Sequence, residues 1–236
     1  MLVKTLRQGT VCTVMALMLA APVNAETNAE KDPWEGFNRA MFGFNEQVDR
    51  FAMKPLAQGY HYVMPDIAER GVSNFFSNLG DIRSAVNNLL QGKIDAALTS
   101  VTRVVFNSTF GLAGFIDIAT PIGLEEKRED FGQTLGVWGA GSGPYLVLPL
   151  FGPSSVRDGV GLVPDMTLDP VGQVDHVPTR NSLYGLRLID ARVELLKAEQ
   201  IISGDKYSFV RDAYLQRREY LVNDGEVQVR FDDNDF

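Results

Sequence analysis

The sequence has very few of the residues that form cross-links or bind metals. A single cysteine, Cys12, and two histidines, His61 and His176, occur in 236 residues. Disulfides need paired cysteines, and zinc sites take most of their ligands from cysteine and histidine. We therefore predict a protein without disulfides, metal or other cofactor. No run of 18 apolar residues follows residue 25, which argues against an ordinary transmembrane helix.

The first 25 residues have the pattern of a secretory signal peptide. A basic start and an apolar stretch over 11–21, too short to span a bilayer, end in the small-residue sequence Val-Asn-Ala. We expect cleavage between Ala25 and Glu26. A lipid-attachment cysteine follows the apolar stretch of its signal, whereas Cys12 lies at the beginning of this one, so we expect no lipid on Cys12.

Acidic residues dominate the remaining chain. It carries 20 basic and 30 acidic residues, a net charge of −10. Proteins that bind nucleic acid need clustered Lys and Arg to contact phosphates. We therefore expect no nucleic acid among the partners.

Apolar residues recur at helical spacing through most of the chain. Asp32, with Pro after it and Glu three residues on, is typical of a helix N-cap, and Pro55 ends or bends that helix. Asn181 is expected to cap a later one. Further helices are predicted over 65–79, 82–91, 94–107, 181–203 and 205–224.

The alternation typical of strands is weak everywhere, so we predict an all-α fold. We expect one helical domain over 32–225, between a short polar leader at 26–31 and an acidic, disordered tail at 226–236.

The first expected helix has an apolar stripe. An aromatic stripe at helical spacing usually belongs to the core, and we favour that interpretation. Phe42 lies off the stripe, however, so a lipid-facing helix stays open as an alternative. The stripe comprises Trp34, Phe37, Met41, Phe44, Val48 and Phe51.

Two segments interrupt the helical pattern. The stretch 110–123 is apolar, contains glycines and predicts a tightly packed turn or a re-entrant segment. Eight glycines lie between Gly132 and Gly161, interleaved with three prolines and several large apolar residues. This composition is too apolar for an exposed linker, so we predict an irregular segment that packs against the core or lipid.

Motifs for catalysis do not emerge. Neither Ser142 nor Ser154 lies in a G-x-S-x-G sequence, and glycines 139, 141 and 143 have the wrong spacing for a phosphate loop. His61 has aromatic neighbours, and His176 has no identifiable partner. We predict that the protein is not an enzyme.

Several segments form a recognisable combination. They are DPWEGFNRAMFGFN (32–45), KPLAQGYHYVMP (54–65), VSNFFSNL (72–79), TRVVFNSTFGLAGFIDIA (102–119), FGQTLGVWGAGSGPYLVLPLFGPSSVRD (131–158) and VRDAYLQRREYL (210–221). Together they resemble the VacJ/MlaA family of the Gram-negative outer membrane and cover nearly all of 32–225.

The resemblance implies a ring of amphipathic helices in the inner leaflet of the outer membrane, associated with a trimeric porin. Such proteins remove misplaced phospholipid from the outer leaflet through an amphipathic channel and pass it to a periplasmic lipid-carrier protein. The resemblance also places the lipid path near a small set of residues. They are Phe44, Asn45, Gly136, Gly139, Gly141 and Gly143.

One departure from the family leaves alternatives open. Many members carry a lipid-modified cysteine shortly before the first segment, whereas 26–31 contains none. A soluble periplasmic lipid-binding or shuttle protein without a lipid anchor is therefore the second hypothesis. A secreted hydrolase, the third, is weakened by the missing motifs.

Overall fold

The computed structural model describes residues 32–198 and 204–226. Cys12, the cleavage site between Ala25 and Glu26, the leader and all but the first residue of the acidic tail lie outside the described residues. In chain order the elements are α3 (Glu35–Val48), the π-helix η2 (Asp49–Met53), α4 (Lys54–Val63), α5 (Asp66–Leu90), α6 (Ile94–Thr109), the 3₁₀ helix η3 (Thr120–Ile122), α7 (Phe131–Val137), β1 (Tyr145–Leu148), β2 (Gly152–Ser155), α8 (Val156–Leu168), the 3₁₀ helix η4 (Pro170–Gln173), α9 (Val177–Ala198) and α10 (Lys206–Val222).

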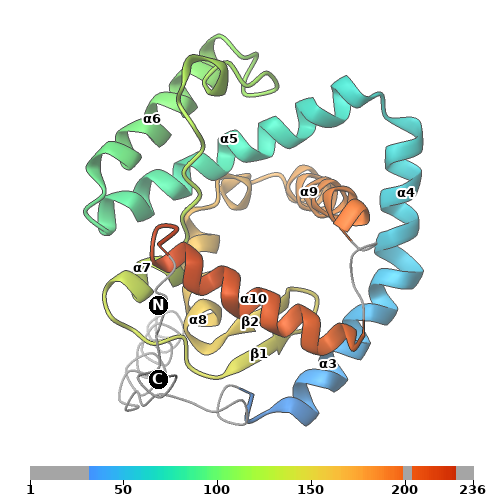
Figure 1. Ribbon diagram of the computed structural model, residues 1–236. Coiled ribbons are helices and arrows are strands. Elements are labelled where there is room, and N and C mark those ends of the chain that lie inside the picture. The colour runs from blue at the N-terminus through green and yellow to red at the C-terminus, as the bar shows by residue number, and fades with distance from the viewer. Residues whose placement is uncertain (1–31, 199–203, 227–236) are drawn as a thin grey trace, which may run out of the picture.

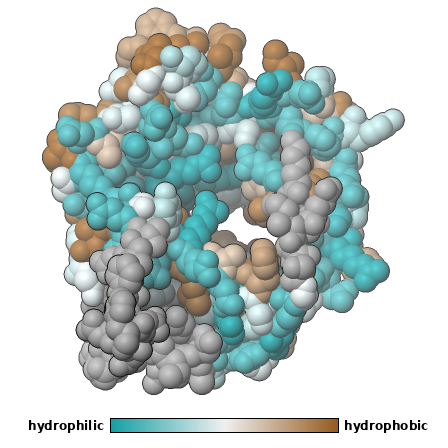
Figure 2. Space-filling model, viewed as in Figure 1, coloured by the Kyte–Doolittle hydropathy of each residue, from teal (hydrophilic) through white to brown (hydrophobic). Residues whose placement is uncertain are grey.

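The helices form a ring. One side consists of α3, η2 and α4; α5 then crosses the top of the view with α6 packed along it (Figure 1). The hairpin β1–β2, α7, α8 and α10 complete the ring, and α9 packs against α4 and α5. The space-filling view has an opening through the centre (Figure 2). The predicted ring-like, mainly all-α fold is thereby confirmed.

The glycine-rich segment contains the one departure from all-α structure in the described part of the chain. It forms a two-stranded antiparallel sheet with Tyr145 opposite Ser155 and Leu148 opposite Gly152. Leu150 and Gly152 adopt positive φ at the turn, and glycine does so without strain. Strands of four residues are too short to give a visible alternation in sequence, which is why the hairpin was not predicted.

The two helices expected over 65–79 and 82–91 are one helix of 25 residues. Gly80-Asp81 separates the two predicted helices in the sequence, but α5 continues through both residues. Asp81 is fully buried and paired with Arg103 of α6, so its role is to hold the two helices together. That pairing overrides the weak helix propensity of the two residues.

Two of three further expectations about helix ends are wrong. Asp32 is not an N-cap, because α3 begins at Glu35 and the buried Asp32 carboxylate instead accepts a hydrogen bond from the Asn38 amide. Pro55 does not end the helical run, since η2 leads directly into α4 and the proline occupies the first turn of α4, where it is tolerated. The run does change direction between α3 and α4, which agrees with the expected bend (Figure 1). Asn181 lies inside α9, which begins at Val177.

The segment after α6 is the tight turn that the sequence predicted. Leu112 and Ala113 adopt positive φ, and a β-carbon on Gly111 would lie 2.1 Å from the carbonyl oxygen of Ile116. The Asn107 side chain accepts the backbone N–H groups of residues 118 and 119 and so fixes the turn to α6. The short helix η3 follows this turn.

Apolar burial is modest for a chain of this size. One cluster joins Val72 and Phe76 of α5 to Val171, and another joins the hairpin residues Tyr145 and Val147 to α10. Much of the interior is polar instead. Fully or nearly buried polar residues along α5 include Asn78, Asp81, Ser84, Asn87 and Asn88.

Candidate functional site

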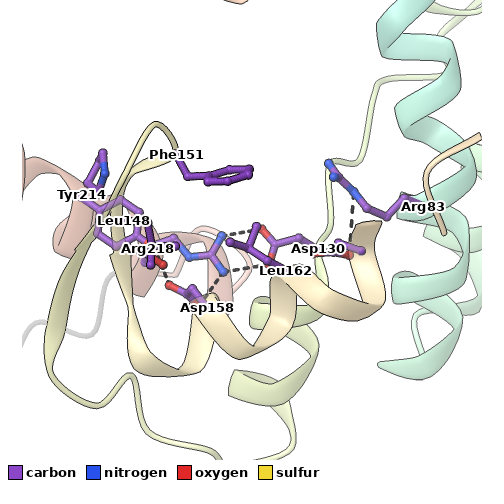
Figure 3. Close-up of a pocket in the computed structure, with 11 residues that line it drawn as sticks. Arg83, Asp130, Leu148, Phe151, Asp158, Leu162, Tyr214 and Arg218 are labelled. Carbon is purple, nitrogen blue, oxygen red and sulfur yellow. Dashed lines mark hydrogen bonds and ion pairs between the residues drawn. The ribbon is translucent and has the colours of Figure 1, made fainter. Parts of the chain in front are cut away.

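A charged cleft of about 180 Å³ (Figure 3) lies among elements that surround the centre of the ring in Figure 1. Residues of α5, the β1–β2 hairpin, α8 and α10 line it, together with the residue that precedes α7. The charged and aromatic ones are Arg83, Asp130, Phe151, Asp158, Asp165, Tyr214 and Arg218.

Arg218 is the centre of the charge network on one side of the cleft. Its guanidinium donates to both oxygens of Asp130, at 2.5 and 2.8 Å, and to Asp158 at 2.9 Å. Tyr214, one turn earlier on α10, donates to the second oxygen of Asp158 at 2.7 Å. These bonds join α10 to α8 and to the start of α7.

Burial and charge act against one another on these carboxyls. Burial alone would raise the pKa of Asp130 and Asp158, but the nearby Arg218 outweighs it and holds both pKa values below the usual range. Both carboxylates are therefore ionised at neutral pH. Arg157 also contacts Asp158, at 3.0 Å, so this side of the cleft is electrically balanced.

The other side of the cleft is formed by α5. Arg83 extends from α5 towards Asp165 of α8, with 4.0 Å between its Nε and the nearer carboxylate oxygen. Asp165 itself accepts hydrogen bonds from the backbone N–H of Phe131 and the amide of Asn87. Burial raises the pKa of Asp165.

Asn45, one of the residues placed on the lipid path, fastens the hairpin to α3. Its amide donates to the Leu148 carbonyl at 2.9 Å, and its carbonyl oxygen accepts the N–H of Leu150 at 2.8 Å. Phe44 beside it is 47% exposed. Neither residue lines the described cleft.

The predicted glycines have different surroundings. Gly139 and Gly143 adopt positive φ, which agrees with the expected tight bends. A β-carbon on Gly136 would lie 2.8 Å from Val222, so this glycine permits close packing of α7 on α10. Gly141 is exposed. None of the four lines the described cleft, and their place on a lipid path stays a prediction.

The aromatic stripe on the first helix does not lie in the core, contrary to the interpretation that we favoured. Trp34, Phe37, Phe44 and Phe51 are all between 45% and 73% exposed. Met41 is half-buried beside the hairpin cluster, and Val48 is half-buried. The polar side of α3 faces inward instead, because the fully buried Asn38 binds the hairpin backbone through the Tyr145 carbonyl.

A larger apolar surface covers α6 and the turn that follows it, where hydrophobic residues gather at the outer edge of Figure 2. On α6 the exposed residues recur at helical spacing, which gives the helix a single apolar outer face. No helix among 32–198 and 204–226 is long and apolar enough to cross a membrane. The exposed residues on α6 and the turn are Ile94, Leu98, Val101, Val105, Phe110, Leu112, Phe115 and Ile116.

The described part of the chain contains no arrangement that could bind a metal through three or more His, Cys, Asp or Glu side chains. His61 pairs with Glu69 at 2.7 Å, and His176 contacts the Thr179 hydroxyl at 2.7 Å. The Ser154 hydroxyl donates to a neighbouring backbone carbonyl. Neither histidine therefore activates a serine through the contacts seen here.

Comparison with known proteins identifies the family. The sequence profile described as MlaA lipoprotein matches residues 30–221, which is most of the chain. A protein of Shigella flexneri named "Intermembrane phospholipid transport system lipoprotein MlaA" is 35% identical over 92% of this chain and 89% of its own length. This chain belongs to the MlaA lipoprotein family.

Two further relatives agree with this membership. The Haemophilus influenzae MlaA lipoprotein, which has the same full name, is 32% identical over 94% of both chains. A solved structure reported as the structural basis for maintenance of bacterial outer membrane lipid asymmetry superposes with a TM-score of 0.72. It is 34% identical, and the match covers 81% of this chain and 99% of that one.

Sequence reasoning missed the charged residues of the cleft in this MlaA-family chain. A signal was present on α10, where Arg218 falls four residues after Tyr214 and eleven after Tyr207, on the buried face of the helix. A charge on such a face must be paired, since an unpaired buried charge is costly. Its partner Asp130 lies 88 residues earlier, so the sequence alone does not identify it.

Proposed function

We propose that this protein is a non-enzymatic component of intermembrane phospholipid transport, located in the outer membrane on its periplasmic side. In this proposal it removes misplaced phospholipid from the outer leaflet. The observation that carries the proposal is the inverted polarity of the ring: charged groups lie beside the central opening, and apolar side chains cover α6 on the outside. Membership of the MlaA family supports it.

The outer apolar face suits the acyl region of a leaflet. Full transfer of one Val, Leu or Ile side chain out of water is worth roughly 1.5–3 kcal/mol. The aliphatic residues of α6 are about half exposed, so burial of this face in lipid would stabilise the embedded state by several kcal/mol. Embedded protein surface could therefore hold the ring at the membrane without an acyl chain on Cys12.

The charged interior suits a headgroup. A phospholipid that moves through a protein ring must keep its polar end in a polar environment, because an unsolvated charge is costly. The balanced carboxylates and guanidinium groups beside the opening supply that environment. No covalent step is needed for such movement, which supports a non-enzymatic role without a cofactor.

The proposal includes partners that the family resemblance implies. These are phospholipid, a trimeric porin within the outer membrane, and a periplasmic lipid-carrier protein that accepts the lipid. We also propose that Phe44, Asn45 and the glycines over 136–143 lie along the lipid path. Support for that placement comes from Asn45, which fastens the hairpin beside the cleft.

Complementation of a strain that lacks the protein tests the function. The wild-type gene should restore a low level of phospholipid on the cell surface, measured by labelling of outer-leaflet lipid. Persistence of surface phospholipid despite normal protein levels would refute the proposal. Fractionation tests the location: recovery in the periplasmic wash instead of salt-resistant outer membranes would favour the soluble shuttle.

A glycine substitution tests the lipid path. Gly141→Leu should impair lipid removal if the exposed glycine borders the path, because the side chain would narrow it. Gly59→Leu on α4 is the matched control, since a β-carbon there meets no atom within 4 Å. Wild-type surface lipid in the Gly141 variant, with the protein still in the membrane, would remove this segment from the path.

A further inference from the structure

Arg83 stands apart from the other charged residues of the cleft because its guanidinium makes no hydrogen bond with the described residues. Its single ion pair is the 4.0 Å approach to Asp165, which is too long for a hydrogen bond. The Nε atom is buried and has no partner. The side chain as a whole is 32% exposed, so its outer end reaches open space.

The other charged residues of the cleft already have partners, so they do not compete with Arg83 for a ligand. Arg218 and Arg157 together balance Asp130 and Asp158. Asp165 accepts the Phe131 N–H with both oxygens, at 3.1 Å each, and the Asn87 amide at 3.3 Å. Asp165 therefore has its own hydrogen-bond donors and holds Arg83 only by charge at a distance.

Opposite Arg83, apolar side chains line the cleft beside the Arg218 charge network. Phe151, which is 61% exposed, projects from the hairpin turn, while Arg83 projects from α5 on the other side (Figure 3). Leu148 and Leu162 lie below Phe151. A ligand in this cleft would thus meet a cationic fork at one side and an aliphatic and aromatic surface at the other.

This juxtaposition has the chemistry of an amphiphilic phosphodiester. A guanidinium presents parallel N–H donors that match two phosphate oxygens, and such charge-assisted pairs are among the strongest hydrogen bonds in proteins. We propose that Arg83 binds the phosphate of a phospholipid headgroup while Phe151 and its apolar neighbours contact the glycerol and upper acyl carbons. This inference rests on the proposed transport function and assigns a ligand-binding role to a residue within it.

Binding to purified full-length protein in a nonionic detergent tests the proposal. The probes are dihexanoylphosphatidylethanolamine, dihexanoylglycerol, which lacks the phosphate, and inorganic phosphate alone. Native mass spectrometry reports the bound fraction of each. We expect Arg83→Gln to weaken phospholipid binding about tenfold, since a charge-assisted bond is lost, and to leave dihexanoylglycerol binding unchanged.

Two control variants separate a binding role from a structural one. Arg128→Gln removes an arginine that is 66% exposed and lies outside the cleft, so phospholipid binding should stay at the wild-type level. Asp165→Asn keeps an oxygen that can accept the Phe131 N–H but removes the negative charge beside Arg83. It should strengthen phospholipid binding, whereas a purely structural pair would make it as harmful as Arg83→Gln.

The outcomes distinguish this inference from the function on which it rests. If wild-type protein binds the phospholipid and Arg83→Gln binds it equally well, the Arg83 site is refuted and transport survives. If wild-type protein binds neither lipid, both proposals fail. Arg83-dependent binding of inorganic phosphate without any binding of the phospholipid would make the cleft a site for the free anion and overturn the lipid assignment.

Discussion

Arg103 lies almost completely buried between α5 and α6, where only 2% of its side chain is exposed. It donates at 2.9 Å to Asp81, which is fully buried on α5. Two further bonds go to the Thr120 hydroxyl at 2.9 Å and to the Leu124 carbonyl at 2.6 Å. One side chain therefore connects the two helices to the segment that follows the tight turn.

We expect Arg103→Met to destabilise the protein strongly and in a pH-dependent way. At about pH 8 the variant leaves the Asp81 carboxylate buried without its cation, which typically costs about 3–5 kcal/mol. The bonds to Thr120 and Leu124 are lost as well, and their cost is included in this 3–5 kcal/mol, about the usual range for such a loss, because the two acceptors then lack their donor.

The pH dependence follows from Asp81. Burial raises the pKa of Asp81 to about 6 against an ordinary value of 3.8, although the neighbouring Arg103 lowers it in part. A folded-state pKa above the unfolded value means that stability from this group is full below about pH 4 and declines as the pH rises through about 6. Without Arg103 the pKa of Asp81 rises further, so a proton neutralises the carboxyl more readily.

Urea unfolding of the detergent-solubilised protein, followed by circular dichroism, measures the effect. The difference between wild type and Arg103→Met should be largest at about pH 8 and clearly smaller at about pH 5, where Asp81 takes up a proton. The double variant Asp81→Asn/Arg103→Met should recover part of the loss at the higher pH. A loss that is equal at both pH values, or below about 1 kcal/mol, would refute the reasoning.

Three further predictions concern other parts of the ring. Asn38→Ala should destabilise by about 2–4 kcal/mol in urea unfolding, because the fully buried amide bonds both Asp32 and the hairpin backbone; unchanged stability would contradict this role. Burial raises the pKa of Asp190 to about 6, so Asp190→Asn should raise the thermal midpoint at about pH 8 but not at about pH 4. An equal shift at both pH values would exclude titration of Asp190 as the cause. Leu98→Glu should move protein out of the salt-resistant membrane fraction, since a charge in an apolar environment costs about 2–3 kcal/mol, and a wild-type distribution would argue against a lipid-facing α6.

The helices were largely predictable because helical periodicity is a local property. The expected helices over 94–107 and 205–224 correspond closely to α6 and α10. Errors fell at positions where a distant partner decides the local structure. Gly80-Asp81 has the composition of a helix break, but Asp81 pairs with Arg103 and the helix continues. Asp32 has the sequence context of an N-cap, but its carboxylate accepts hydrogen bonds from Asn38 and Tyr207.

The candidate site was the least predictable part. Hydrogen-bonded partners in the site lie up to 88 positions apart in the chain. In the sequence, each charged residue alone looks like an ordinary surface charge. Of the residues that the family resemblance suggested, Asn45 bonds the hairpin, and none lines the cleft. Only the folded chain brings Arg83, Asp130 and Arg218 to one opening.

The sequence by itself determined the helical class and, through its combination of segments, the MlaA family. Tertiary structure alone decided which way each amphipathic helix faces. The apolar stripe of an amphipathic helix has the same period whether it packs on a core or on lipid, so sequence favoured core for Trp34–Phe51. The folded ring leaves several such stripes exposed and buries polar side chains of α3 and α5, because Asn38 and Asp81 on those helices find their hydrogen-bond partners on neighbouring elements, the hairpin and α6.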